Sequence, residues 1–408
     1  MKAMLPGSTI GVIGGGQLAR MMILEARRMG YRVAVLAPSE GEAAVPLADV
    51  WIQGAVGDLK AAARLAESSD VVTIDTEHVP ASVLERLELT RPVRPSSAVL
   101  RTIQDRSVQR RFLESIGAPQ PRCRPVSTRT ALYEEALTIG FPCVLKTRHA
   151  GYDGKGQTVI RNEKELAAAW ATVGENPAML EEFVEFDREI SVLLARSPSG
   201  EVRFYPVAQN VHRHHILHTT MAPAPISREV EDRAREIAGR IADSLDHAGM
   251  MAVEMFVVDG SRLLINEIAP RPHNSGHYTF GACATSQFEQ HVRAVLDLPL
   301  GDPSLCRPAA TVNLLGELWQ HGEPDWTRVL SCPEARLHLY GKDEARPGRK
   351  MGHVLVLDEE RDRALRTSEA LLEDLKTSGA SGHLQVETPP RSTRADGSGF
   401  GGADHRVG

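Results

Sequence analysis

The stretch GVIGGGQLARMMILEARRMGYRVAVLAP, residues 11–38, opens the first folding unit of the chain. An apolar run enters three consecutive glycines, a stretch with helical spacing of apolar residues follows, and a second apolar run closes the stretch. This order predicts a strand, a tight turn, a helix and a second strand. The apolar runs at 49–54 and 70–75, with a helical pattern at 59–68 between them, continue the series. We therefore predict a parallel sheet that is covered by helices on both faces.

The three glycines resemble the phosphate-binding loop of a dinucleotide fold, but the loop lacks a necessary companion. Such a site needs a carboxylate about 20 residues further on, at the end of the second strand, where it binds the ribose. Here that strand ends in VLAP, residues 35–38, and Glu40 comes only in the following loop. An NAD-dependent oxidoreductase is therefore a remote alternative. Either the glycines only provide a tight turn, or the helix start binds a phosphorylated small molecule.

Composition gives no reason to expect a nucleic-acid or membrane partner. The chain has 408 residues and a formal net charge of -6, and 42% of its residues are hydrophobic. Two or three ordinary globular domains are expected at this length. No apolar run reaches the length of a membrane span, and the N-terminus has no cleavable signal pattern. The five cysteines are scattered and never spaced C-x-x-C, which predicts reduced thiols, a cytoplasmic location and no zinc site.

A lysine and a glycine-rich segment form the first part of a predicted nucleotide site. Lys146 ends an apolar strand, and GYDGKGQ, residues 151–157, follows in the next loop. Backbone N–H groups of such a loop can close over phosphates, with lysine charge nearby. The alternative is a plain hairpin tip, since glycine is common in turns.

A second predicted hairpin, residues 250–270, carries two glutamates. If Gly260 and Ser261 form a two-residue turn, Glu254 lies directly opposite Glu267, with Cβ atoms about 4.5–5.5 Å apart. Two such carboxylates need a cation between them, and Mg²⁺ bridging nucleotide phosphates is the natural one. A turn at Asp259 and Gly260 would break this opposition, and the sequence leaves both open. Three features together predict an ATP site without a Walker loop: the strand that ends at Lys146, the glycine-rich loop at 151–157 and the hairpin that carries the two glutamates.

The segment APRPHNSGH, residues 269–277, follows the hairpin directly. It is rich in hydrogen-bond donors, and its prolines restrict the backbone, so it could hold a small oxyanion against the γ-phosphate. A rigid polar loop without a ligand is the alternative. The histidines at 212–218 do not predict a metal site, because His214 and His218 would need a helix to converge and the surrounding pattern is β.

Six motifs, read in order, are similar to those of the N5-carboxyaminoimidazole ribonucleotide synthase family, ATP-grasp enzymes of purine biosynthesis. They are GGGQLARM at 14–21, TEHVP at 76–80, GYDGKGQ at 151–157, EEFV at 181–184, NEIAPRPHNSGHYT at 266–279 and YGKDEARPGRKMGH at 340–353. No single motif decides the resemblance, but their order over residues 11–353 makes it specific.

The resemblance implies an α/β and α+β fold in three parts. These are a Rossmann-like preATP-grasp domain at 1–104, an ATP-grasp domain at 105–300 and a small mixed C-terminal domain at 301–387. Residues 388–408 lack apolar periodicity and are predicted to be a disordered tail. The implied reaction carboxylates 5-aminoimidazole ribonucleotide with bicarbonate and ATP, through carboxyphosphate, and releases ADP and phosphate. The family also implies a homodimer.

The resemblance further assigns site residues, position by position. The ATP residues would be Arg106, Lys146, Gly151, Tyr152, Asp153, Gly154, Lys155, Gly156, Gln157, Glu181, Glu182, Phe183, Val184, Glu189, His212, Asn266 and Glu267. The Mg²⁺ ligands would be Glu254 and Glu267. Bicarbonate would meet Arg271, His273, Asn274 and Ser275. The aminoimidazole nucleotide would contact Glu77, Tyr152 and Asp153, and its phosphate would contact Lys342, Arg349 and Lys350.

Four of these residues are predicted to act in catalysis: Lys146, Asp153, Arg271 and His273. Lys146 and Arg271 would offset developing charge, and Asp153 would orient or deprotonate the amine. We also expect Gly15, Gly16 and Gln17 to border the phosphoribose of the nucleotide substrate.

Two departures from the family pattern stand out. Family members often have a second glutamate two residues before Glu77, and the shorter Asp75 at this position puts the contact of that glutamate in doubt. His214 and His215 replace smaller residues, with no clear consequence. Three alternatives remain besides the oxidoreductase. They are a formate-dependent glycinamide ribonucleotide transformylase, a biotin carboxylase-like enzyme and a non-catalytic nucleotide sensor, although the donors at 271–275 argue against the sensor.

Overall fold

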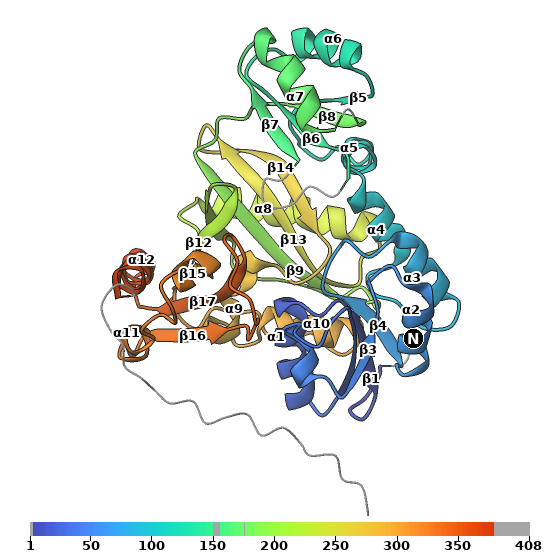
Figure 1. Ribbon diagram of the computed structural model, residues 1–408, viewed down its shortest axis with the longest axis vertical. Helices are drawn as coiled ribbons and strands as arrows, with labels where there is room; N and C mark the ends of the chain where they lie inside the picture. The colour runs from blue at the N-terminus through green and yellow to red at the C-terminus, as the bar shows by residue number, and fades with distance from the viewer. Residues whose placement is uncertain (1–2, 150–155, 175, 379–408) are drawn as a thin grey trace, which may run out of the picture.

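The computed structural model of the chain describes residues 3–149, 156–174 and 176–378. The predicted flap residues 151–155 and the predicted tail 388–408 lie outside the described residues. The described elements form three sheets with helices packed on them, and the sheets meet near the centre of the molecule (Figure 1).

The N-terminal unit is a four-stranded parallel sheet with the strand order β3-β2-β1-β4. Its elements are β1 (Thr9–Ile13), α1 (Gln17–Arg28), β2 (Arg32–Ala37), β3 (Val50–Gln53), α2 (Leu59–Glu67), β4 (Val71–Ile74) and α3 (Ala81–Glu88), with a 3-10 turn at Val45–Leu47. Along β1, Val12 packs into a core with α1, whereas Ile13 packs into a second core with α2 and α3. The predicted parallel sheet with helices on both faces is confirmed.

Two capped helices lead from this unit into the rest of the chain. They are α4 (Ser97–Gln104) and α5 (Arg106–Ser115). Ser96 accepts a hydrogen bond from the backbone N–H of Val99, and Asp105 accepts one from Ser107. Each side chain satisfies a backbone donor that the start of a helix leaves unpaired, and this fixes where each helix begins.

A small antiparallel sheet with the order β5-β8-β6-β7 lies at the top of Figure 1. Its elements are β5 (Cys123–Val126), α6 (Arg129–Ile139), β6 (Cys143–Thr147), β7 (Gln157–Ile160), a 3-10 turn at Glu163–Glu165, α7 (Leu166–Thr172) and β8 (Ala178–Glu182). The two helices and one face of the sheet enclose a separate apolar core. Lys146 pairs with Gln157 across β6 and β7, as the predicted hairpin requires.

The third sheet has nine strands, in the order β14-β13-β9-β11-β12-β15-β17-β16, with β10 paired to β9. Its strands are β9 (Arg188–Arg196), β10 (Val202–Phe204), β11 (Ala208–Arg213), β12 (Ile216–Ala222), β13 (Gly249–Val258), β14 (Arg262–Ala269), β15 (Ala309–Leu315), β16 (Ala335–Leu339) and β17 (Lys350–Leu357). The associated helices are α8 (Arg228–Ser244), α9 (Thr279–Ala282), α10 (Gln287–Val295), α11 (Thr327–Leu330) and α12 (Arg361–Ser378), with 3-10 turns at Asn274–Gly276 and Gly316–Trp319.

This sheet includes strands on both sides of residue 301, where the sequence predicts the start of a C-terminal domain. Strand β12 pairs with β15, and Thr219 lies opposite Val312. The C-terminal residues therefore extend the large sheet, while α12 and the 326–329 region pack with them into a core of their own. No helix in the described part of the chain is long and apolar enough to cross a membrane.

Candidate active site

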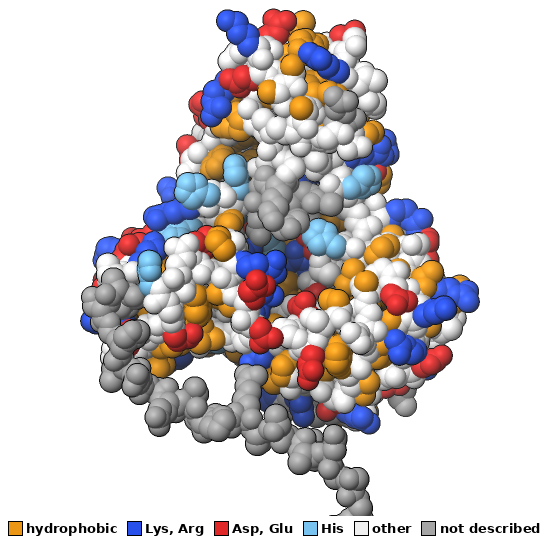
Figure 2. All heavy atoms as spheres, in the orientation of Figure 1, with side chains coloured by type: hydrophobic (Ala, Val, Ile, Leu, Met, Phe, Trp, Pro, Cys, Tyr) orange, Lys and Arg blue, Asp and Glu red, His pale blue; other side chains and the backbone are white. Residues whose placement is uncertain are grey.

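One cavity of about 740 Å³ is lined by loops and the start of α1 in the N-terminal unit and by residues of the other two sheets. In Figure 2, Lys, Arg and His side chains gather around the centre of the face that it shows. The predicted site residues that line the cavity are Gly15, Gly16, Gln17, Glu77, Arg106, Lys146, Gln157, Glu181, Glu182, Phe183, Val184, Glu189, His212, Glu254, Asn266, Glu267, Arg271, His273, Asn274 and Lys350. Among the described residues predicted for the site, Gly156, Ser275, Lys342 and Arg349 are not part of this lining. Gly151, Tyr152, Asp153, Gly154 and Lys155 lie outside the described residues.

The glycine loop at the start of α1 is already occupied by a carboxylate of the same chain. Gly16 donates its backbone N–H to Asp75 Oδ2 at 2.7 Å. Gly14 has φ +109, and a Cβ there would lie 1.8 Å from Asp75 Oδ1. Asp75 therefore fills the position where a dinucleotide fold holds its pyrophosphate. This contact argues against the oxidoreductase and gives Asp75 a role inside the fold.

Burial raises the pKa of Asp75 to about 6, against the hydrogen bond from Gly16 and the charge of Arg271. A second anion at this helix start would lie next to the buried carboxyl group of Asp75, which already accepts the N–H of Gly16. The cavity wall next to it, formed by Gly15, Gly16 and Gln17, remains open to a ligand.

The loop at 340–350 reaches the same wall through Lys342. Its Nζ donates to Gln17 Oε1 at 2.9 Å and to the carbonyl of Lys350 at 2.7 Å. Burial and then the charge of Arg349 lower the pKa of Lys342 to about 8. Lys350 lines the cavity directly, whereas Arg349 donates to the carbonyl of Glu344. A cationic group thus lies beside the predicted phosphoribose wall.

On the opposite side, Lys146 and Glu181 form a buried ion pair. Lys146 Nζ lies 2.6 Å from Glu181 Oε2, and Glu181 is 2% exposed. Burial alone would raise the pKa of Glu181, but Arg110 and Lys146 outweigh it and bring the value to about 2. Arg110 does not line the cavity but binds Glu181, and the sequence analysis missed it. It follows Arg106 by four residues, and residues at this spacing share one face of a helix, which is the signal that could have identified it.

The carboxylate hairpin forms, although its turn differs from the predicted one. Val258 pairs with Arg262, so Asp259, Gly260 and Ser261 form a three-residue connection, with positive φ at Asp259 and Gly260. The predicted two-residue turn is wrong. The register then shifts between Met255, which pairs with Ile265, and Glu254, which pairs with Glu267. Asn266 is the extra residue of this β-bulge, and it restores the predicted opposition of the two glutamates.

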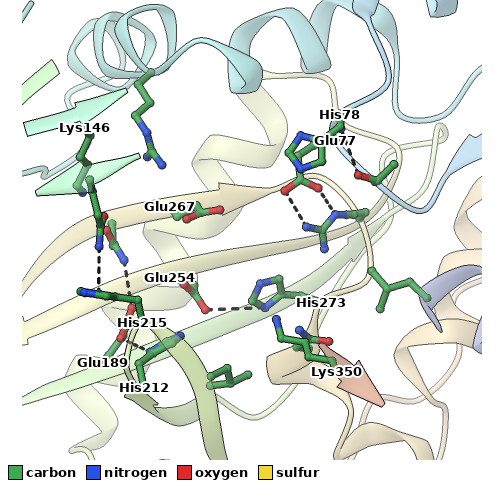
Figure 3. Close-up of a pocket in the computed structure, with 18 of the residues that line it drawn as sticks. Glu77, His78, Lys146, Glu189, His212, His215, Glu254, Glu267, His273 and Lys350 are labelled. Atoms are coloured by element: carbon green, nitrogen blue, oxygen red, sulfur yellow. Dashed lines mark hydrogen bonds and ion pairs between the residues drawn. The ribbon is translucent and has the colours of Figure 1, made fainter. Parts of the chain in front are cut away.

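Glu254 and Glu267 lie on neighbouring strands and face the cavity together with Glu189 and His212 (Figure 3). Burial, Glu189 and Glu267 raise the pKa of Glu254 to about 8. One ligand atom each from Glu189, His212 and Glu254 lies within 4.8 Å of the others. His212 Nδ1 is 2.7 Å from Glu189 Oε2, and although burial opposes it, this contact raises the pKa of His212. Crowded carboxylates of this kind fit a divalent cation with oxygen ligands.

The segment after β14 is fixed by a side chain of α10. Gln287 accepts a hydrogen bond from the N–H of His273 at 3.0 Å and donates to its carbonyl at 2.8 Å. His273 Nδ1 lies 2.9 Å from Ser275 Oγ. Burial and then Arg271 lower the pKa of His273 to about 3, so the imidazole is neutral and its 3.8 Å approach to Glu254 is not an ion pair. Asn274 Oδ1 is buried without a hydrogen-bond partner among the described residues.

Arg271 and Glu77 bind each other across two units of the chain. Arg271 Nη2 donates to Glu77 Oε1 at 2.8 Å, and its Nε donates to Oε2 (Figure 3). Burial raises the pKa of Glu77, but Arg271 outweighs it and lowers the value to about 2. The sequence assigns these residues to two different substrates, and the structure places them as one pair at the cavity wall.

The other histidines show a mixed picture. His214 and His215 form the turn between β11 and β12, with φ +50 and +65. His215 lines the cavity and its Nδ1 lies 3.2 Å from Gln157 Nε2. His218 lies in β12, so no helix brings it to His214, in agreement with the sequence.

Family models match three consecutive regions of the chain. They describe a ribonucleotide synthetase preATP-grasp domain at residues 7–104, an ATP-grasp domain at 111–288 and a phosphoribosylaminoimidazole carboxylase C-terminal domain at 309–367. The predicted fold class is confirmed by these matches and by the sheets described above.

Curated relatives match over nearly the whole chain. The chain is 41% identical to the N5-carboxyaminoimidazole ribonucleotide synthase of Bacillus subtilis over 88% of its own length and 93% of that protein. It is 44% identical to the synthase of Brucella melitensis over 86% of its length and 96% of that protein.

Solved structures agree. An ADP complex of an N5-carboxyaminoimidazole ribonucleotide synthetase is 43% identical, with a TM-score of 0.87 over 91% of this chain and 98% of that one. The synthase of Aspergillus clavatus in complex with ADP and 5-aminoimidazole ribonucleotide is 30% identical, with a TM-score of 0.83 over 92% and 100%. The chain therefore belongs to the N5-carboxyaminoimidazole ribonucleotide synthase family of ATP-grasp ligases.

Proposed function

We propose that the protein carboxylates 5-aminoimidazole ribonucleotide with bicarbonate and ATP, forming N5-carboxyaminoimidazole ribonucleotide, ADP and phosphate in purine biosynthesis. One observation carries the proposal. A single cavity joins the Lys146–Glu181 pair, the crowded glutamates and the donor segment at 271–274. A nucleotide, a cation and a small oxyanion can therefore meet there. The relatives that match over most of the chain support the same reaction.

ATP would lie between the small antiparallel sheet and the hairpin. Glu181, Glu182, Phe183 and Val184 would face the base, and Lys146 and Arg106 would meet the phosphates. Because Lys146 is buried, its charge acts in a poorly solvated site, where it stabilises a charged phosphoryl group more than it would in water. Asn266 Nδ2 donates to Glu189 Oε1 at 3.1 Å, which orients both side chains in the proposed ATP site.

Glu254 and Glu267 would hold Mg²⁺, with Glu189 and His212 beside them. The crowding that raises the pKa of Glu254 is the observation that fits a divalent cation. When bound, the cation would neutralise charge on the transferring phosphoryl group. The protein's own contribution is a fixed pair of carboxylates, set opposite each other by the bulge at Asn266.

Bicarbonate would bind beside Arg271, His273 and Asn274, where it attacks the γ-phosphorus of ATP. Buried Ser275 does not line the cavity and would act only through its contact with His273. The attack forms carboxyphosphate and releases ADP. The carbon of carboxyphosphate is activated, so the weakly nucleophilic amine of aminoimidazole ribonucleotide can take it, and phosphate leaves. Because its imidazole is neutral, His273 can donate a hydrogen bond from one ring nitrogen and accept one at the other. Asp153, which lies outside the described residues, remains our candidate for orienting or deprotonating the amine.

The aminoimidazole nucleotide would lie against the wall formed by Gly15, Gly16 and Gln17. Glu77 would meet it from the N-terminal unit, and Lys342, Lys350 and Arg349 would supply positive charge for its phosphate. Because Glu77 and Arg271 bind each other, substrates of both residues meet at this pair. We further propose a cytoplasmic homodimer, on the family resemblance and the pattern of the cysteines.

An ADP-release assay that omits each substrate in turn tests the proposed function. We expect full turnover only with ATP, bicarbonate and 5-aminoimidazole ribonucleotide together. ATP turnover that ignores both other substrates would overturn the proposal. Formate-dependent turnover of glycinamide ribonucleotide, or bicarbonate-dependent turnover with biotin, would favour the two other ATP-grasp reactions.

A further inference from the structure

Arg110 contacts both β8 and β14, yet nothing in the motifs assigns it a role. It belongs to α5, and its side chain is 3% exposed. It lies one helical turn beyond Arg106, which lines the cavity, so the two side chains share a face of the helix. A guanidinium this deeply buried requires acceptors for its donors.

The first acceptor is Glu181. Arg110 Nε lies 2.9 Å and Nη2 lies 2.8 Å from Glu181 Oε1. The other oxygen of the same carboxylate, Oε2, lies 2.6 Å from Lys146 Nζ. Both guanidinium nitrogens bind one oxygen of the carboxylate, and the second oxygen is left to the lysine.

The remaining acceptors are two carbonyls of β14. Arg110 Nη1 donates to the carbonyl of Ile265 at 3.0 Å, and Nη2 donates to that of Asn266 at 3.3 Å. Strand β14 is at the edge of its sheet, so these carbonyls have no neighbouring strand on that side. They belong to the β-bulge that places Glu267 opposite Glu254.

We propose that Arg110 is a positioning residue that ties the Lys146–Glu181 pair to the bulge carrying Glu267, and so sets the nucleotide phosphates and the metal ligands in one fixed relation. The inference rests on the proposed ATP and Mg²⁺ sites. A planar group with several donors is required, because one cation must serve a carboxylate and two carbonyls in different directions. Lysine has the same charge but lacks the planar arrangement of several N–H donors.

The test compares Arg110→Met and Arg110→Lys in the full-length protein. ADP binding is measured by calorimetry, and Mn²⁺ binding in the presence of ADP is measured by electron paramagnetic resonance. For Arg110→Met we expect both affinities to fall about tenfold or more. For Arg110→Lys we expect ADP affinity within about threefold of the wild type, with Mn²⁺ affinity still about tenfold lower. Lysine can pair with Glu181 but cannot also hold both carbonyls.

Arg94→Met is the matched control. Arg94 is 4% exposed and donates to the carbonyl of Val295, and it does not line the cavity. Its loss should lower thermal stability but leave ADP and Mn²⁺ affinities within about twofold. If Arg110→Met does not fold, Arg110→Lys still tests the inference, because its Mn²⁺ affinity should fall while its ADP affinity stays close to that of the wild type.

Wild-type-like Mn²⁺ affinity in Arg110→Lys, or wild-type-like affinities in a folded Arg110→Met, would overturn the inference alone. A wild-type protein that binds neither ADP nor Mn²⁺ would overturn the proposed function, and this inference with it.

Discussion

At the scale of single residues, Asp75 explains why the glycine loop is misleading. The loop has the tight turn and the helix start of a phosphate site, but the chain supplies its own anion. The sequence places Asp75 at the end of the fourth predicted strand, and the parallel order of β1 and β4 brings that end beside Gly16. Spacing along the chain cannot reveal this contact, because the two residues lie 59 positions apart.

The shifted pKa of Asp75 predicts a pH-dependent stability. Its value rises from 3.8 to about 6 on folding, so the folded state holds the proton more tightly and loses stability as pH rises through this window. Asp75→Asn should abolish that loss, and its stability relative to the wild type should rise by about 2 kcal/mol between about pH 4.5 and about pH 7.5. Urea unfolding at the two pH values measures the difference.

Asp70→Asn is the control for this prediction. Asp70 also accepts a backbone N–H, from Thr9 at 2.8 Å, but it is exposed. It should show no comparable gain at the higher pH. A flat difference between Asp75→Asn and the wild type would contradict the account of Asp75.

The crowded glutamates predict opposite effects of one substitution. Glu254→Gln removes a charge next to Glu189 and Glu267, so the metal-free protein should melt at a higher temperature under mildly alkaline conditions. The same change removes a proposed Mg²⁺ ligand. The Mg²⁺ concentration that gives half-maximal nucleotide binding should therefore rise about tenfold or more. Thermal melts without metal, and ADP titrations at graded Mg²⁺, check both signs. Unchanged Mg²⁺ dependence would remove Glu254 from the proposed metal site.

At the scale of elements, the β13–β14 hairpin shows how far periodicity reaches. The apolar pattern predicts both strands. The predicted opposition of Glu254 to Glu267 is counted from a two-residue turn at Gly260 and Ser261, and this turn does not form. The connection is one residue longer, and the bulge at Asn266 compensates. The sequence shows no sign of the bulge, because the carbonyls that it exposes are bound by Arg110 from a helix more than 150 residues earlier.

The start of α1 supports a prediction about substrate discrimination. Gln17 lines the cavity and accepts a hydrogen bond from Lys342, far from Lys146 and Glu181. Gln17→Ala should raise the KM for 5-aminoimidazole ribonucleotide several-fold, because the proposed phosphoribose contact is removed and Lys342 loses a hydrogen-bond acceptor. The KM for ATP should stay within about twofold. Steady-state kinetics with each substrate varied in turn decides, and the reverse pattern would return the glycine loop to ATP.

At the scale of the whole molecule, the sequence predicts more of the parts than of their assembly. The parallel sheet and the small hairpin of β6 and β7 follow from apolar periodicity and turn residues. The joining of β12 to β15 does not, because strand partners this far apart leave no local pattern. The pairing of Arg271 with Glu77 is equally invisible, since each residue lies in a different unit. The resemblance supplied the list of site residues, and the fold placed most of the described ones around one cavity.

The most direct test of the central claim follows the atoms of bicarbonate. The protein is given ATP, 5-aminoimidazole ribonucleotide and bicarbonate labelled with ¹³C and ¹⁸O, and products are analysed before the label exchanges with water. Attack of bicarbonate on ATP predicts that the phosphate released carries one ¹⁸O and that the carboxylated ribonucleotide carries the ¹³C. Phosphate without ¹⁸O, or a ribonucleotide without ¹³C, would contradict the proposed reaction.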